Sequence, residues 1–153
     1  MINKLFKIKY LSEKFYKDFP NDKYSEIEHK DERPYIVFIV NIENHRFGIP
    51  FRTNIKHDFC YKFTNTDRTT QSSTGIDFTK AVIIDNLEYI GNNANIDQKE
   101  FNELNVKIEY IIRRFKTYVK NYIKYTKTNN IKILNIRYKY TTLKYFHKEL
   151  GLV

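Results

Sequence analysis

The sequence predicts an α+β fold in which short antiparallel strands pack against one long helix. Residues 35–40, Tyr-Ile-Val-Phe-Ile-Val, are the most apolar run of the chain, and such a short β-branched run is typical of a central strand. Asn44-His45 predicts a turn into a second strand over residues 46–50, which makes a hairpin. After Asp97, a suitable N-cap, apolar side chains recur at helical spacing at Leu104, Ile108, Ile111, Phe115, Tyr118 and Tyr122. The length of 153 residues suits a single domain over residues 1–153.

Shorter elements are predicted at the two ends of the chain. Lysines alternate with apolar residues over residues 4–10, which indicates a half-exposed edge strand. Ser12–Phe19 is expected to be a short helix with Ser12 as its N-cap, because a proline follows directly. Residues 131–140 fit either a helix or a strand, and Thr141 or Thr142 is expected to cap a final helix.

The middle of the chain is expected to alternate strands and polar connections. Residues 59–63 are a strand candidate, and the Thr- and Ser-rich residues 64–75 are expected to form a loop. Residues 78–85, centred on Ala-Val-Ile-Ile, predict a second buried strand. The Asn-rich residues 91–95 are expected to connect this strand to the long helix.

The composition excludes several classes of site. Four glycines cannot supply a G-x-G-x-x-G fingerprint or a G-x-x-x-x-G-K loop, and no G-x-S-x-G or H-E-x-x-H occurs. The single cysteine, Cys60, excludes a disulfide framework and is expected to be a buried thiol. No stretch approaches the roughly 18 apolar residues of a membrane span, and no signal peptide is visible. We therefore expect a cytoplasmic, soluble protein without a metal or other cofactor.

Positive charge is concentrated in the last third of the chain. The net charge is +9, and residues 1–96 carry 14 basic and 13 acidic groups, whereas residues 97–153 carry 13 and 5. A concentration of this kind is typical of a polyanion-binding segment, although acidic protein partners and simple solvation explain it as well. Within the long helix the basic residues share the face opposite to the apolar one, which predicts either a phosphate-tracking surface or a solvated outer face. These residues are Arg113, Lys116, Lys120, Lys124 and Lys127.

Polar side chains gather next to the ends of predicted strands, where a rigid sheet commonly holds binding and catalytic residues. One set, Arg52, Thr53, Asn54, Lys56 and His57, follows the hairpin, and the others are His29 with Arg33 and Ser72, Ser73 and Thr74. Each has an ordinary interpretation as a turn or surface residue. Together they offer hydroxyl, guanidinium and ammonium groups with little carboxylate, which suits a phosphodiester better than a sugar or a peptide.

Four stretches of the sequence resemble one family of proteins. They are residues 33–40 (Arg-Pro-Tyr-Ile-Val-Phe-Ile-Val), residues 42–51, the Arg52-Thr-Asn-Ile-Lys-His57 segment, and residues 72–84 (Ser-Ser-Thr-Gly-Ile-Asp-Phe-Thr-Lys-Ala-Val-Ile-Ile). These stretches resemble the toxins of type III toxin–antitoxin systems, the ToxN, AbiQ, TenpN and CptN groups, and above all the last two. The resemblance implies a twisted antiparallel sheet like that of the MazF and Kid toxins. It also implies a metal-independent endoribonuclease that is inhibited by a repeated pseudoknot RNA and serves in growth arrest or phage defence.

The resemblance also implies roles for individual residues. The implied catalytic residues are Arg52, Thr53, Asn54, Lys56, His29 and His57. In metal-free RNA cleavage the 2′-hydroxyl attacks the neighbouring phosphate, so Arg52 and Lys56 would stabilise the developing charge. Thr53 and Asn54 would orient the phosphate, and either histidine would carry a proton. In this sequence Arg52 stands where a hydroxyl residue is common in the family, and Ile55 stands where a lysine is common.

RNA partners are expected to use a wider set of residues. The implied RNA-binding residues are Arg33, Ser72, Ser73, Thr74, Lys80, Arg113, Lys116, Lys120 and Lys124. Ser72, Ser73 and the aromatic residues nearby would hold bases of the target, and the helix would hold the backbone of the RNA antitoxin in a toxin–RNA assembly. Two other interpretations stay open, a non-catalytic RNA-binding module and a protein whose basic face meets an acidic partner.

Overall fold

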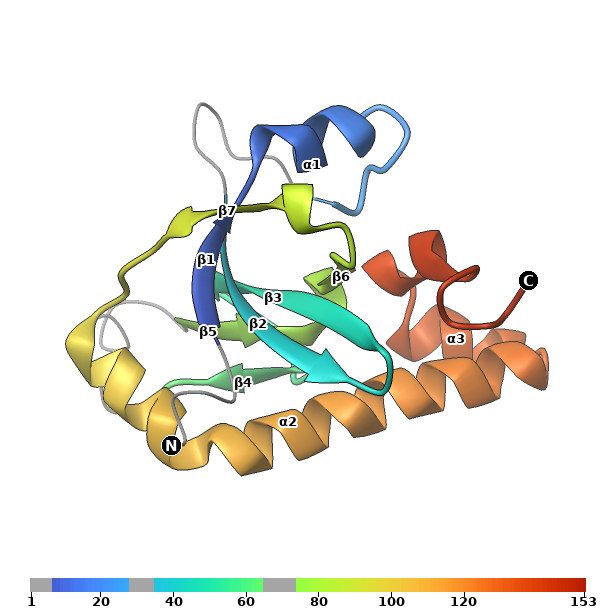
Figure 1. The fold of residues 1–153 in the computed structure, drawn as a ribbon. Helices are drawn as coiled ribbons and strands as arrows, with labels where there is room; N and C mark the ends of the chain where they lie inside the picture. Colours follow the sequence, from blue (N-terminus) through green and yellow to red (C-terminus); the bar gives the residue numbers. More distant parts are fainter. Residues whose placement is uncertain (1–6, 28–34, 65–73) are drawn as a thin grey trace.

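The computed structural model describes residues 7–27, 35–64 and 74–153, and confirms the α+β class. Within the described chain, seven strands form one antiparallel sheet in the order β4-β5-β3-β2-β1-β7, with β6 paired to β3. The long helix α2 runs along one side of this sheet, and the C-terminal segment lies beside its far end (Figure 1). The strands are β1 (Lys7–Leu11), β2 (Ile36–Ile42), β3 (His45–Thr53), β4 (Cys60–Lys62), β5 (Thr74–Asp77), β6 (Val82–Ile83) and β7 (Ile90–Asn93).

Helical segments accompany the sheet, and the longest of them, α2, covers one of its faces (Figure 1). They are α1 (Glu13–Asp18), α2 (Gln98–Lys127), α3 (Ile131–Arg137) and three short 3₁₀ segments, η3 (Phe78–Lys80), η4 (Leu87–Tyr89) and η5 (Thr142–Phe146). The Ser12 and Asp97 side chains accept hydrogen bonds from the first backbone amides of α1 and α2, which confirms both predicted N-caps. The structure assigns the first seven residues of the ambiguous 131–140 region to a helix, α3. The capping residue of the last segment is Thr141, and that segment begins as a 3₁₀ turn where a regular helix was predicted.

The predicted hairpin is present, with its turn one residue earlier than expected. β2 and β3 pair from Val37↔Pro50 to Ile42↔His45, so the turn consists of Glu43 and Asn44. Glu43 adopts a positive φ of 57°, which tight two-residue hairpin turns require. β3 continues past Pro50 to Thr53, because β5 supplies a second partner for its last three residues.

Four predictions about the sheet were wrong, one because of a local hydrogen bond and the others because of long-range strand pairing. The segment predicted as one strand over residues 78–85 is divided into η3 and the short β6, and the unpredicted strand β5 precedes it, beginning in the last two residues of the predicted loop (64–75). The division arises because the Asp77 side chain accepts a hydrogen bond from the Thr79 amide and turns the chain. The connector predicted over residues 91–95 contains β7, which pairs with β1. β1 is consequently an inner strand and not the edge strand that its lysines predicted.

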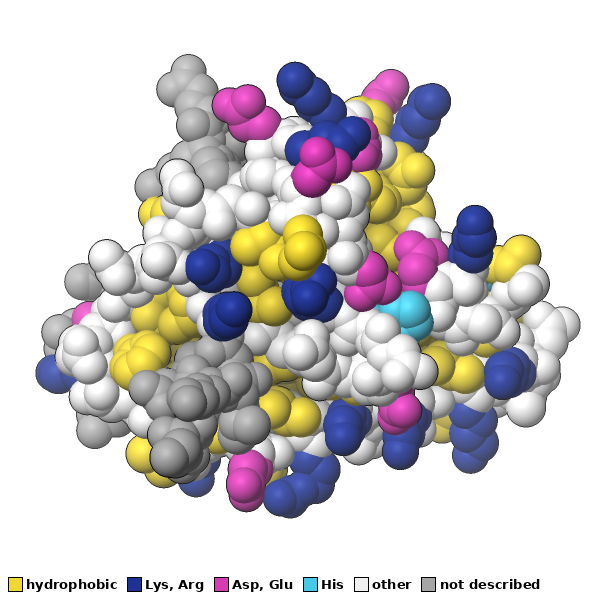
Figure 2. Space-filling view, in the orientation of Figure 1, with side chains coloured by type: hydrophobic (Ala, Val, Ile, Leu, Met, Phe, Trp, Pro, Cys, Tyr) yellow, Lys and Arg dark blue, Asp and Glu magenta, His cyan; other side chains and the backbone are white. Residues whose placement is uncertain are grey.

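The core lies between the sheet and α2. All six apolar residues predicted for the buried face of α2 are buried. Phe115 of α2 packs edge-on against Phe47 of β3, at 5.1 Å between ring centroids, and against Phe78, at 5.4 Å. The opposite face of the helix carries the predicted basic residues, all exposed, and Lys and Arg side chains line the lower rim of the molecule along α2 (Figure 2).

Candidate functional site

A buried carboxylate organises the polar residues at the end of β3. Asp77, the last residue of β5, has no exposed surface. Its Oδ2 accepts a 2.6 Å hydrogen bond from Nη1 of Arg52, whose side chain is 25% exposed. Its Oδ1 accepts bonds from the Thr79 amide (3.0 Å) and the Thr79 hydroxyl (2.6 Å). The carboxylate is thus satisfied on both oxygens and fixes the guanidinium of Arg52 at the protein surface.

His57 approaches the same carboxylate from the β3–β4 connection. Its Nε2 lies 3.3 Å from Oδ1 of Asp77, and its Nδ1 accepts a 3.1 Å hydrogen bond from the amide of Phe59. Because Nδ1 is an acceptor, a neutral imidazole carries its proton on Nε2, the nitrogen 3.3 Å from Asp77. Both ring nitrogens are therefore engaged within the protein, and this geometry suits a residue that positions Asp77 better than one that exchanges protons with a substrate.

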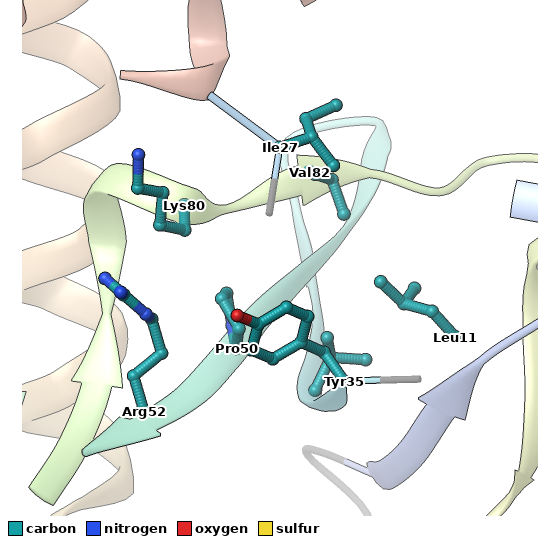
Figure 3. A pocket seen from close by; sticks show the side chains of 8 residues that line it. Leu11, Ile27, Tyr35, Pro50, Arg52, Lys80 and Val82 are labelled. Carbon is teal, nitrogen blue, oxygen red and sulfur yellow. The ribbon is translucent and has the colours of Figure 1, made fainter. Parts of the chain in front are cut away.

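Arg52 and Lys80 form the cationic side of a small pocket. Its other walls are apolar or aromatic: Leu11, Ile27, Tyr35, Val37, Pro50 and Val82. Figure 3 shows the charged ends of Arg52 and Lys80 on one side and Leu11, Ile27 and Val82 on the other, with the hydroxyl end of Tyr35 pointing toward the Arg52 side. The pocket holds about 20 Å³, enough for one water molecule, so a larger ligand would rest on its rim.

The residues that follow β3 are exposed. Thr53, Asn54 and Lys56 all face solvent, and Asn54 has a positive φ of 60°, which asparagine tolerates better than most residues. Ile55 between them is buried at 3% exposure and anchors the connection to the core. An isoleucine at this position is therefore explained by packing, since a lysine there would place its charge in the core.

Thr74 lies directly opposite Thr53 in the β3–β5 pairing. Thr74 has no exposed surface, and its hydroxyl has no hydrogen-bond partner. Of the other predicted site residues, His29, Arg33, Ser72 and Ser73 lie outside the described residues.

Thr74→Val is expected to raise the free energy of unfolding by about 1 kcal/mol, because valine fills the same volume without burying an unpaired hydroxyl. Thermal melting measures this as a rise in Tm of roughly 2–4 °C for a domain of this size. Thr142→Val is the control, since the equally buried Thr142 hydroxyl donates a 3.1 Å bond to the carbonyl of Thr79. That variant should melt at a lower temperature. A lower Tm for T74V as well would contradict the prediction.

The basic face of α2 does not belong to the Arg52 site. Tyr61 of β4, opposite Ile76 of β5, turns toward α2, where its hydroxyl bonds to Glu103. Arg52 follows Phe51, the residue that pairs with Ile76, and side chains alternate along a strand, so Arg52 points to the other face of the sheet. The structure thus separates the predicted basic residues into two surfaces, Arg52 with Lys80 on one face and the α2 residues behind the other.

Sequence reasoning missed Asp77, the residue that connects Arg52 with His57. Its signal was the Asp77-Phe-Thr79 pattern, in which the carboxylate bonds the backbone and hydroxyl two residues on. The expectation of a buried thiol is confirmed: Cys60 is 3% exposed, and burial raises its pKa to about 11. A thiolate nucleophile is therefore disfavoured at neutral pH.

Two further classes of site are not observed among residues 7–27, 35–64 and 74–153. In these ranges no three His, Cys, Asp or Glu side chains are grouped as metal ligands would be. No helix in the same ranges is long and apolar enough to span a membrane. In comparisons with protein-family models, curated proteins and solved structures, nothing matches this chain.

Proposed function

We propose that this protein is a metal-independent endoribonuclease, the toxin of a type III toxin–antitoxin system, with a sheet of the MazF and Kid kind. The observation that carries the proposal is the guanidinium of Arg52, held by the buried Asp77 beside the ammonium of Lys80. Two cations held near the end of β3 suit a phosphodiester, whose charge increases during cleavage. The toxin would act in the cytoplasm, in growth arrest or phage defence.

In the proposed reaction the substrate supplies its own nucleophile. The 2′-hydroxyl gives up its proton to water as its oxygen forms a bond to the adjacent phosphorus, and the 5′-oxygen takes up a proton from water as its bond to phosphorus breaks. The products are a 2′,3′-cyclic phosphate and a 5′-hydroxyl. Arg52 and Lys80 would stabilise the additional negative charge on the phosphate oxygens, while Thr53, Asn54 and Lys56 would align the strand.

His57 receives a positioning role in this proposal. Both of its ring nitrogens are engaged, one with Asp77 and the other with the Phe59 amide. By holding Asp77 in place it would orient Arg52. His57→Asn should therefore lower the cleavage rate by the same factor at every pH and leave the shape of the pH–rate profile unchanged. Loss of a proton-transfer residue would instead abolish the rise or the fall of the rate on one side of that profile.

The test of the function is cleavage in the absence of metal. Purified protein is incubated with total RNA in EDTA, with and without RNA transcribed from the repeats expected upstream of the reading frame. We expect discrete cuts that bear 5′-hydroxyl and 2′,3′-cyclic phosphate ends, and we expect the repeat RNA to suppress them. The absence of cuts under these conditions would overturn the proposal that the protein is a nuclease.

A second candidate, a non-catalytic RNA-binding module, is favoured by the exposed basic face of α2. This face carries Arg113, Lys116, Lys120 and Lys124 and lies behind the sheet from Arg52. In the toxin proposal this face holds the antitoxin RNA. In the alternative, RNA binding by this face is the whole function of the protein. Salt-dependent RNA binding that is lost in a K116A/K120A variant, with no cuts by the wild type, would favour the alternative.

A further inference from the structure

An exposed tyrosine lies next to the Arg52 site, in a part of the sequence that no motif singled out. Tyr140, in the connection between α3 and η5, is 62% exposed. The ammonium of Lys139 lies 5.4 Å from the centre of its ring. A large aromatic side chain left in solvent with a lysine against its ring is the arrangement on which nucleobases stack in single-strand-binding proteins.

One hydrogen bond connects the backbone of Tyr140 to the cationic side of the pocket. Nζ of Lys80 donates a 3.3 Å bond to the carbonyl oxygen of Tyr140. Lys80 and Arg52 both line the pocket, and the side chain of Lys80 reaches from the pocket to the carbonyl oxygen of Tyr140. A phosphate bound at Arg52 and Lys80 would therefore lie close to the backbone that carries Tyr140.

The backbone on both sides of Tyr140 is anchored in the core. Tyr138 is buried, and its hydroxyl donates a 2.9 Å bond to the carbonyl of Tyr118 in α2. Thr142 is also buried, and its hydroxyl bonds to the carbonyl of Thr79, next to Lys80. Because the neighbouring residues are fixed, the backbone of Tyr140 is held next to Lys80 before a ligand arrives, which lowers the entropic cost of binding.

The charge around the ring suits a nucleic acid strand. Lys144 donates to the carbonyl of Lys139 at 3.1 Å, and its charge is balanced by Glu26 at 3.6 Å. Asp77 balances Arg52 in the same way. Lys80 and Lys139 are lysines in direct contact with Tyr140, one at its carbonyl oxygen and the other at its ring.

We infer that Tyr140 is a stacking platform for a base of single-stranded RNA that flanks the phosphate held at Arg52 and Lys80. The platform would bind any base, because every base offers a flat face, and it would favour unpaired over double-stranded RNA. The identity of the ligand as RNA rests on the proposed function; the position of the platform follows from the contacts of Lys80.

The test measures binding separately from cleavage. A short single-stranded RNA with 2′-O-methyl groups throughout cannot be cleaved by 2′-hydroxyl attack, and its affinity is measured by fluorescence anisotropy. We expect Tyr140→Ala to weaken binding about tenfold and Tyr140→Phe to have little effect, because stacking needs the ring and not the hydroxyl. Tyr110→Ala is the matched control, since Tyr110 is 45% exposed beside Arg114 but lies on α2, behind the other face of the sheet.

The outcomes distinguish this inference from the proposed function. Equal affinities of wild type and Y140A, or equal losses in Y140A and Y110A, would overturn the platform even if the wild-type protein cleaves RNA. A loss of affinity confined to Y140A would support the platform even if the wild-type protein makes no cuts in EDTA. The same loss in Y140F as in Y140A would also overturn the platform, because it would assign the effect to the hydroxyl.

Discussion

Arg52→Ala is expected to abolish RNA cleavage and to destabilise the fold at the same time. Removing the guanidinium takes away the proposed charge stabilisation of the phosphate, a loss of at least about 100-fold in rate. It also leaves the fully buried Asp77 without its 2.6 Å ion-pair partner, which is expected to cost about 3 kcal/mol of the free energy of unfolding. Cleavage assays and thermal melting of the same preparation measure the two effects.

Because the two effects coincide in one variant, a second variant must separate them. In R52A/D77N the side chain at position 77 is neutral and still accepts bonds from Thr79, so most of the lost stability should return. Cleavage should not return. A fully active double variant would remove Arg52 from the reaction, and a single R52A variant as stable as the wild type would show that the ion pair contributes little to the fold.

Gly75→Ala is expected to have the second largest effect. A Cβ at this position would lie 2.0 Å from the carbonyl oxygen of Tyr61, and that atom belongs to the backbone of the paired strand β4. Relief of the overlap requires β4 and β5 to separate, so we expect a loss of about 3 kcal/mol of the free energy of unfolding. Cleavage should fall with it, because β5 ends in Asp77. Denaturant unfolding with a parallel cleavage assay measures both.

Gly48→Ala is the matched control in the same sheet. Gly48 is a buried strand glycine too, but a Cβ there would meet the side chains of Ile84 at 3.2 Å and Val37 at 3.3 Å. Side chains of this kind yield by a few tenths of an ångström, so G48A should be clearly more stable than G75A. Equal losses in the two variants would show that the β4–β5 pairing is not the source of the effect.

The long helix and the hairpin could be predicted from the sequence because local patterns specify them. In α2 the cap at Asp97 and the spacing of its apolar residues lie within one continuous segment, and the structure agrees with both. The hairpin likewise needs only two adjacent strands and a tight turn. The exposed basic face follows from the same helical period, because the residues opposite a buried stripe must face solvent.

The strands β5 and β7 could not be predicted in this way. Thr74–Asp77 and Ile90–Asn93 are short and rich in polar residues or glycine, so their own composition indicates loops. They become strands because β3 and β1 offer unpaired backbone groups to them. The same pairing places Asp77 beside Arg52 across 25 positions of sequence.

The sequence by itself therefore determined the α+β class, the apolar and basic faces of α2, and the presence of Arg52 among exposed polar residues. Only the tertiary structure decided that Asp77 holds Arg52, that His57 is engaged at both nitrogens, and that Tyr140 stands beside Lys80. The physical reason is the range of the interactions. Periodicity and caps act within a few residues, whereas ion pairs and strand pairing join groups that only the folded chain brings together.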